Sequence, residues 1–203
     1  MIFNEVYQRY SEPKTRRKAF LIIENAIQCF DKKGFEHVTF TMIARESGLT
    51  APSLRHYFAN IEEIRRTAMK YIHLAAQKIV LDAMAKAQNP KELLKLYLYG
   101  HYLWVTQLKT YFRVWLNFLS YSSTRKHERQ LNTLATENGT KRIIELLSIG
   151  RSEGHFKHDD DYIGARYIQT FILGWLTACV SQDIENIEAY SEAMMKNCMA
   201  VFV

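Results

Sequence analysis

Residues that interrupt helices are scarce in this chain, which has 8 glycines and 3 prolines among 203 residues. So few breaking residues argue against collagen-like, linker-rich and turn-dense all-β proteins. Cysteine is scarce as well: Cys29, Cys179 and Cys198 are odd in number, widely spaced and include no Cys-x-x-Cys pair. The sequence therefore predicts neither a disulfide framework nor a zinc knuckle, and it favours a reducing compartment.

Long apolar runs are missing too. No stretch of about 18 uncharged apolar residues occurs, so we expect no membrane-spanning segment. The chain starts with Met-Ile-Phe-Asn-Glu and lacks a basic segment followed by an apolar run, so we expect no secretory signal. Together with the few cysteines, these absences predict a cytoplasmic protein without a membrane partner.

Catalytic motifs are the third absence. The sequence contains no Gly-x-Ser-x-Gly, His-Glu-x-x-His, P-loop or Gly-x-Gly-x-x-Gly pattern, so it predicts no enzyme and no cofactor. His155 and His158, followed by three aspartates at 159–161, are of metal-ligating types. They form either a metal site or a solvated loop before a helix. Because no second cluster at ligand spacing supports them, we predict no metal site.

Positive charge is concentrated in the first third of the chain. The net charge is +6, with 48% apolar and 24% charged residues, as in a globular protein. Between Lys14 and Lys70 there are 11 basic and 6 acidic residues, so this segment holds nearly all of the excess. Such asymmetry indicates that the basic part meets nucleic acid or another anionic surface.

Apolar residues recur at spacings of three and four through most of the chain, as in Ala19, Ile22, Ile23 and Ala26. This period is that of amphipathic helices. We therefore predict an all-α fold of about nine helices: a three-helix head, a long fourth helix, and a helical second domain. The predicted domains are residues 1–60 and 61–203. The expected helices cover about residues 15–33, 40–47, 51–58, 61–87, 91–107, 110–121, 125–149, 162–181 and 185–202.

Residues 39–58 have the spacing of a helix-turn-helix. Thr39 and Thr50 stand where two helices need N-caps, and Gly48 permits the left-handed backbone of a tight turn. Ala44 is small enough for the second helix to cross over it, and Leu54 points into the core. Two short helices of an ordinary bundle share this spacing, but the caps, the basic surplus and the flanking helices favour DNA binding. The outer surface of the second helix then carries Ala51, Pro52, Ser53, Arg55 and His56.

The segment from about Thr15 to Tyr71 resembles the DNA-binding domain of the tetracycline-repressor (TetR) family. The resemblance implies a dimeric transcriptional regulator, usually a repressor, which binds a palindromic double-stranded DNA operator. It further implies release by a small-molecule effector held in the C-terminal domain. The matching residues are Phe30, Gly34, Phe35, Thr39, Ile43, Ala44, Gly48, Leu49, Leu54, His56, Tyr57, Phe58, Glu62 and Glu63. The DNA contacts implied for this chain are Thr39, Thr41, Ala51, Pro52, Ser53, Arg55, His56 and Tyr57.

Two positions depart from the family pattern. The family often has a lysine where Ile61 stands, near a phosphate, and an isoleucine cannot supply that charge. A tyrosine is common in the family where Arg55 stands. Arg55 either restores the lost charge or reads guanine O6 and N7 with two hydrogen bonds. The operator sequence is therefore not transferable from relatives.

An unusual number of aromatic residues lies between positions 97 and 121. They form either solid core or the wall of a cavity for a hydrophobic or aromatic effector, whose polar end Tyr97, His101 or Tyr121 would hold. Arg113 either meets an anionic ligand or is solvated or paired on the helix surface. The predicted ligand-binding residues are Tyr97, His101, Trp104, Phe112, Trp115, Phe118 and Tyr121.

The last two predicted helices are apolar enough to require cover, and the family resemblance implies a two-fold four-helix seam between subunits. The predicted homodimer interface consists of Ile168, Phe171, Ile172, Trp175, Tyr190 and Met194. Two other functions remain open: a DNA-binding regulator without a ligand, and an all-α small-molecule-binding or interaction module without DNA binding. Ile61 is the residue that favours the latter.

Overall fold

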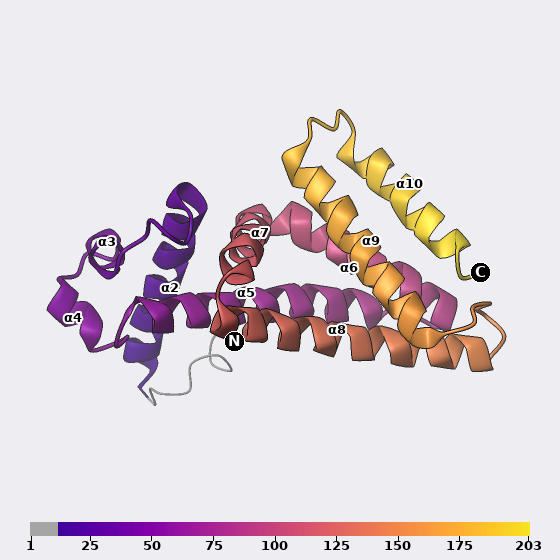
Figure 1. Ribbon diagram of the computed structural model, residues 1–203, viewed down its shortest axis with the longest axis horizontal. Coiled ribbons are helices and arrows are strands. Elements are labelled where there is room, and N and C mark those ends of the chain that lie inside the picture. The colour runs from indigo at the N-terminus through magenta and orange to yellow at the C-terminus, as the bar shows by residue number, and fades with distance from the viewer. Residues whose placement is uncertain (1–11) are drawn as a thin grey trace. The chain divides into compact units, whose positions relative to one another are not determined.

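The computed structural model describes residues 12–203, in which all regular structure is helical (Figure 1). This confirms the predicted all-α class. The helices follow the predicted order, and most of their ends lie within a few residues of the predicted ones. They are α2 (Pro13–Lys33), α3 (Phe40–Glu46), α4 (Ala51–Arg55), α5 (Ile61–Met84), α6 (Pro90–Gln107), α7 (Lys109–Ser123), α8 (Lys126–Ser152), α9 (Asp161–Ser181) and α10 (Ile187–Ala200).

Packing divides the chain into two compact units. The first contains the residues through Ala75 together with residues 110–130, and the second contains residues 76–109 and 131–203. Along the chain the unit changes inside α5, at the start of α7 and inside α8, so each change falls within a helix and not in a linker. The domain boundary predicted after residue 60 stays a prediction, and residues 1–11 of that predicted domain lie outside the described part of the chain.

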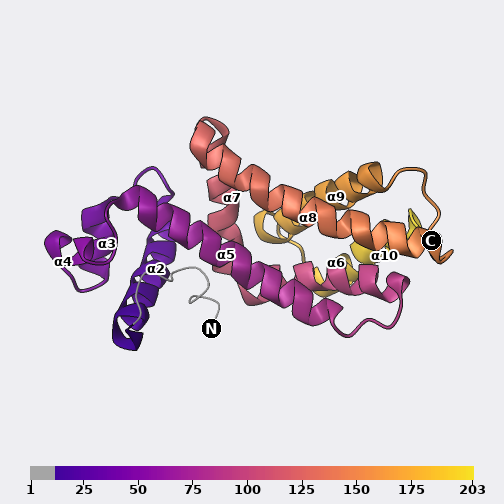
Figure 2. The same ribbon diagram turned by 90° about the horizontal axis from the view of Figure 1, so that it is seen from below.

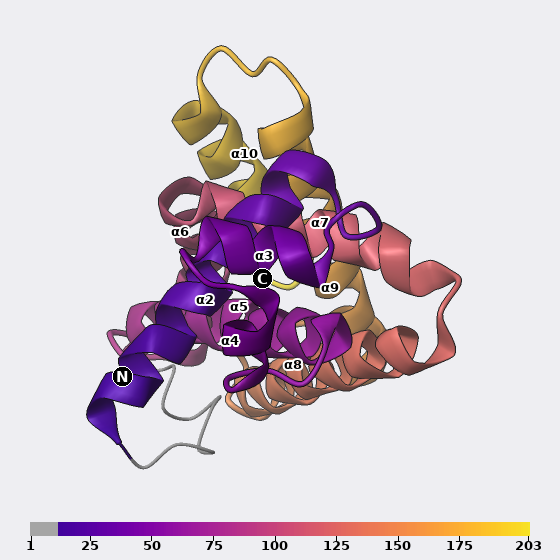
Figure 3. The ribbon, with the colours of Figure 1, turned by 90° about the vertical axis from the view of Figure 1, so that its left-hand side faces the viewer.

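The core of the first unit is built on α2. Its periodic apolar residues, from Ala19 to Phe30, are all buried, and Phe30 stacks on Phe35 at 4.4 Å between ring centroids. Gly34 ends the helix with a φ of 76°, a left-handed conformation that suits glycine. Figure 3 shows α3 and α4 in front of α2 within this unit.

The second unit consists mainly of α6, α8, α9 and α10 (Figure 2). Helix α9 packs against α6 and α10. It is also tied to α8, because the Thr140 hydroxyl donates to Oε1 of Gln169 at 2.8 Å. Trp175 on α9 donates from Nε1 to the Ser191 hydroxyl of α10 at 3.2 Å. These side chains hold the helices in one arrangement.

Helix α9 has the length and mean hydropathy of a membrane span, with a hydropathy of 1.2 over its apolar window. In that window, 44% of the helix is buried inside the protein. Ile168 and Trp175 are buried within the second unit, and core helices share this composition with membrane spans.

Candidate nucleic-acid interface and effector site

Local hydrogen bonds shape the helix-turn-helix. The Thr39 hydroxyl accepts from the Met42 amide at 3.3 Å, and the Thr50 hydroxyl accepts from the Ser53 amide at 3.2 Å, so both predicted N-caps form. Between the two helices, Gly48 has a φ of 65°. This left-handed residue lets the Leu49 amide reach back to the Ala44 carbonyl at 2.8 Å. The turn thus closes without any non-glycine residue in a strained conformation.

Apolar packing and side chains of α2 orient the motif. Ile43, Ala44 and Leu54 are fully buried, as the spacing predicted. Two polar side chains of α2 bind the end of α3: Lys18 donates to the Ser47 carbonyl at 3.2 Å, and Asn25 donates to the Ser47 hydroxyl at 3.3 Å. The turn is therefore anchored to α2, and α4 is held with its outer side in solvent.

The outer side of α3 and α4 carries the side chains that the sequence assigned to DNA. Arg55 makes no hydrogen bond or ion pair with any described residue, which leaves its five donors available. The Thr39 hydroxyl accepts the N-cap hydrogen bond of α3. The Ser53 hydroxyl lies 2.9 Å from the Thr50 hydroxyl, which is the N-cap of α4. Thr39, Thr41, Pro52, Arg55 and His56 are exposed, whereas Ala51, Ser53 and Tyr57 are half-buried.

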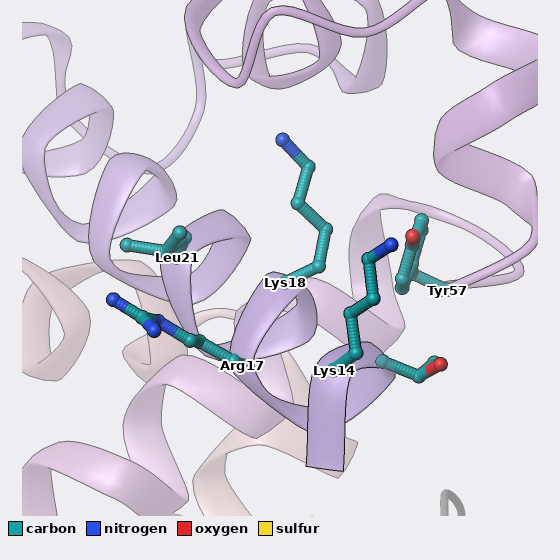
Figure 4. A pocket seen from close by; sticks show the side chains of 6 residues that line it. Lys14, Arg17, Lys18, Leu21 and Tyr57 are labelled. Atoms are coloured by element: carbon teal, nitrogen blue, oxygen red, sulfur yellow. The ribbon is translucent and has the colours of Figure 1, made fainter. Parts of the chain in front are cut away.

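A basic hollow of about 400 Å³ lies in the first unit between α2 and the end of α4 (Figure 4). Its lining combines three cations with an apolar residue and an aromatic ring: Lys14, Arg17, Lys18, Leu21 and Tyr57, beside Thr15. Sequence reasoning counted these cations without giving them a role. The signal was their spacing of three and four, which places them on one face of α2.

The start of α5 is closed by its own side chains. The Asn60 side chain accepts from the Glu63 amide at 2.9 Å, and the Glu63 carboxylate accepts from the Ala59 amide at 2.6 Å. This reciprocal capping uses two amides at the helix start. Ile61, the residue that departs from the family pattern, is half-buried there.

Helix α7 packs on the head of the first unit through ionic contacts. Arg113 donates from Nε to Asp31 at 2.8 Å and makes a second bond from Nη2, so it forms a bidentate pair on α2. These hydrogen bonds raise the pKa of Arg113. The Tyr111 hydroxyl donates to Glu24 at 2.6 Å. Arg113 is therefore paired with a carboxylate, one of the two alternatives left open by the sequence.

The aromatic residues assigned to one ligand wall are divided between the two units. Phe112, Trp115, Phe118 and Tyr121 lie on α7 in the first unit. Phe118 and Tyr121 pack on Phe35, with ring centroids 5.5 and 5.4 Å away. The Arg65 and Arg125 guanidinium groups lie over the Tyr121 ring at 5.2 and 3.9 Å. Both rings therefore contribute to the packing of the head.

Tyr97, His101 and Trp104 lie on α6 in the second unit. The rings of Tyr97 and His101 are 4.5 Å apart, and His101 Nδ1 is 2.9 Å from the Tyr97 carbonyl oxygen. Burial lowers the pKa of His101 to about 4, so the ring is neutral near pH 7. Burial also raises the pKa of Tyr97. The structure thus brings together two uncharged polar rings in an interior setting.

The residues assigned to the subunit seam differ in exposure. Ile168, Ile172 and Trp175 are buried inside the protomer, whereas Phe171, Tyr190 and Met194 are half-buried. The face of α9 that lies in solvent carries other residues: Ile163, Tyr167, Leu173 and Gly174.

The histidine and aspartate loop before α9 forms ordinary structural contacts. His158 Nε2 is 2.6 Å from Asp161, whose other oxygen accepts from Arg151 at 2.7 Å. Within residues 12–203, no group of three or more His, Cys, Asp or Glu side chains is placed to hold a metal ion.

Comparison with known proteins identifies the helix-turn-helix. Residues 22–68 match the profile of the family described as bacterial regulatory proteins, tetR family. This confirms the resemblance found in the sequence and the assignment of a helix-turn-helix of DNA-binding transcriptional regulators. No curated protein matches the chain significantly.

Solved structures share the fold over almost the whole chain. A protein from Saccharomonospora viridis, described as a transcriptional regulator in complex with choline, has a TM-score of 0.80 at 17% identity, covering 91% of this chain and 97% of its own. The TetR-family transcriptional regulator from Cytophaga hutchinsonii gives 0.76 at 20% identity, with coverages of 95% and 96%. AibR in complex with isovaleryl coenzyme A and operator DNA gives 0.71 at 18% identity, with coverages of 90% and 96%. At these identities the likeness shows the fold alone.

Proposed function

We propose that this chain is a ligand-responsive transcriptional repressor of the cytoplasm, and not an enzyme. It binds a palindromic operator as a homodimer and is released by a small effector. The observation that carries the proposal is the exposed, basic outer side of a fully capped helix-turn-helix. Two such surfaces, related by a two-fold axis, enter successive major grooves about 34–36 Å apart.

Within this function, Arg55 reads a base. It is exposed on α4, it has no partner among the described residues, and an arginine matches guanine O6 and N7 with two hydrogen bonds. Replacing Arg55 by Ala is expected to weaken operator binding by about 1–3 kcal/mol and to relax preference at one operator position. A mobility shift with the upstream DNA of its own gene and single-position variants measures both effects. An equal loss on every sequence would assign Arg55 to phosphate, and a Lys91→Ala variant serves as the control.

The basic hollow binds the operator backbone. Lys14 and Arg17 are exposed and face the same hollow as Tyr57, as a phosphate-binding surface requires. Replacing both by Gln is expected to lower affinity uniformly across sequences and to reduce the slope of log K against log salt by about two. The matched control is the pair Lys32→Gln and Lys33→Gln, which removes the same charge from the other end of α2. An equal slope change in the control would place the phosphate contact elsewhere.

The exposed face of α9 forms the dimer. Ile163, Tyr167 and Leu173 leave large apolar surfaces in solvent, and Gly174 gives a second helix room to approach. Tyr190 and Met194 of α10, which the sequence assigned to the seam, are half-buried in the second unit. A two-fold packing of these helices covers them.

The effector binds the second unit at α6. Similar folds are found in a regulator in complex with choline and in one with isovaleryl coenzyme A and operator DNA, which supports the idea that this fold takes small ligands. The predicted compound is hydrophobic or aromatic, with Tyr97, His101 and Trp104 lining its site.

One observation favours a DNA-binding regulator without a ligand: Phe112 and Phe118 are fully buried and Tyr121 is buried, so this side of α7 is packed as solid core.

A further inference from the structure

Helix α7 is bound to α2 by polar side chains within the first unit. Arg113 donates to both carboxylate oxygens of Asp31, and the Tyr111 hydroxyl donates to Glu24 at 2.6 Å. The Asp31 side chain is only 12% exposed, and Arg113 is the only cation among residues 12–203 that pairs with it. Removing one partner of such a pair leaves a partly buried charge without compensation. The pair therefore holds α7 in one position along α2.

A second set of contacts fixes the other end of α7 to the loop that follows α2. Arg125, which directly follows the last turn of α7, donates to Glu36 at 3.0 Å and to the Tyr121 carbonyl at 2.9 Å. Its guanidinium also lies over the Tyr121 ring, whose centroid is 5.4 Å from that of Phe35. With both ends attached in this way, α7 cannot shift without breaking charged contacts.

Helix α2 is also the element that holds the helix-turn-helix, because Lys18 and Asn25 bond Ser47 at the end of α3. The contacts therefore run without a gap from α7 through α2 to the DNA-reading motif. At its own start, α7 is separated from α6 by a break at Leu108, where φ is −124° and ψ is 47°. Helix α6 and most of α8 belong to the second unit. Through α7, the head thus has two covalent connections to the second unit besides α5.

We propose that Asp31 and Arg113 are positioning residues for operator recognition: by fixing α7 to α2, they set which separation of half-sites the dimer accepts. A head connected through α5 alone can turn about one stem, whereas a head that also holds α7 keeps one orientation. Two recognition helices of fixed orientation meet half-sites at one separation. The inference rests on the proposed function for the dimer and its palindromic operator. Neither residue lies on α3 or α4, so both act through other residues.

The spacing between half-sites is the variable that tests this role. The operator is located by footprinting in the upstream DNA of the gene, and duplexes are made with one or two base pairs inserted or removed at its centre. Wild-type affinity is expected to fall about tenfold or more for one base pair, because the second head then misses its half-site. Asp31→Asn and Arg113→Gln should each lose about tenfold at the native spacing, and the penalty for one base pair should shrink to about threefold or less.

The opposite charges of the two residues separate positioning from attraction to DNA. Asp31→Asn raises the net charge and Arg113→Gln lowers it, so a purely electrostatic effect would change affinity in opposite directions. Loss of one shared pair changes affinity in the same direction, and the double variant should resemble either single one. Asp82→Asn is the control, because it breaks the exposed Lys78–Asp82 pair and removes the same charge as Asp31→Asn. Opposite effects of the two variants, an equal loss at every spacing, or an equal effect of the control would overturn the proposal.

Hydrogen exchange tests the attachment of α7 without DNA. Arg113→Gln is expected to speed exchange of the α7 amides about tenfold, while residues 131–152 of α8 and the Asp82→Asn control stay unchanged. Unchanged exchange in α7 would show that the pair does not hold the helix, and the proposal fails. Thermal melting confirms that each variant is folded. If the wild-type chain binds no DNA, the proposed function fails and the positioning role with it, while exchange still decides whether the pair fixes α7 to α2.

Discussion

Gly174→Glu is expected to convert the protein into monomers. Operator affinity should then fall by about a hundredfold to ten-thousandfold, because a monomer has no second DNA-binding head linked to the first. Gly174 lies on the exposed face of α9, and a Cβ built there has no neighbour within 4 Å. The protomer therefore tolerates the larger side chain. A glutamate in the middle of a two-fold helix seam would face its own copy, and like charges in a desolvated contact are unfavourable.

Sedimentation gives the oligomeric state of this variant, and a mobility shift gives its affinity. Gly174→Ala is the control, since it adds one methyl group without charge and keeps the surface small. Thermal melting should show an intact protomer in both variants. A Gly174→Glu protein that still sediments as a dimer would place the subunit contact on another face.

Trp175→Ala is expected to destabilise the second unit itself, by about 3–5 kcal/mol. The indole is 1% exposed in the single chain, and its Nε1 donates to the buried Ser191 hydroxyl. Removing it leaves a cavity between α9 and α10 and deprives the hydroxyl of its donor, so two costs add. Denaturant unfolding of the variant measures the change in free energy.

Protein concentration separates this core role from a seam role. A loss of stability that persists in dilute, monomeric protein indicates an intramolecular core residue. A variant that is monomeric yet as stable as the dissociated wild type would instead place Trp175 between subunits. Leu134→Ala is the control, because Leu134 is 58% exposed on α8 and its truncation should change stability little.

Features that depend on neighbouring residues could be predicted from the sequence. The caps at Thr39 and Thr50, the turn at Gly48 and the end of α2 at Gly34 were all predicted correctly. Each depends on hydrogen bonds or a backbone angle within a few residues. Such signals are present in any short window of the chain, so sequence reasoning reaches them directly.

Helical phase, by contrast, says which residues share a face but not which neighbour that face meets. Phe118 and Tyr121 were grouped with Tyr97 as one aromatic wall, yet they pack on Phe35, more than 80 positions earlier. For Arg113 the sequence left open an anionic ligand or a place on the helix surface, solvated or paired. Its partner, Asp31, also lies more than 80 positions earlier in the chain.

The sequence by itself determined the helical class, the position and caps of the helix-turn-helix, and the basic character of the head, because these depend on residue type and on spacings of a few residues. Only the tertiary structure decided that Trp175 is core while Gly174 is surface, and that Phe118 and Tyr121 pack on Phe35. Such decisions depend on the docking of helices that are distant along the chain. An apolar or polar stripe has the same pattern whether it meets its own fold, a second copy or a ligand.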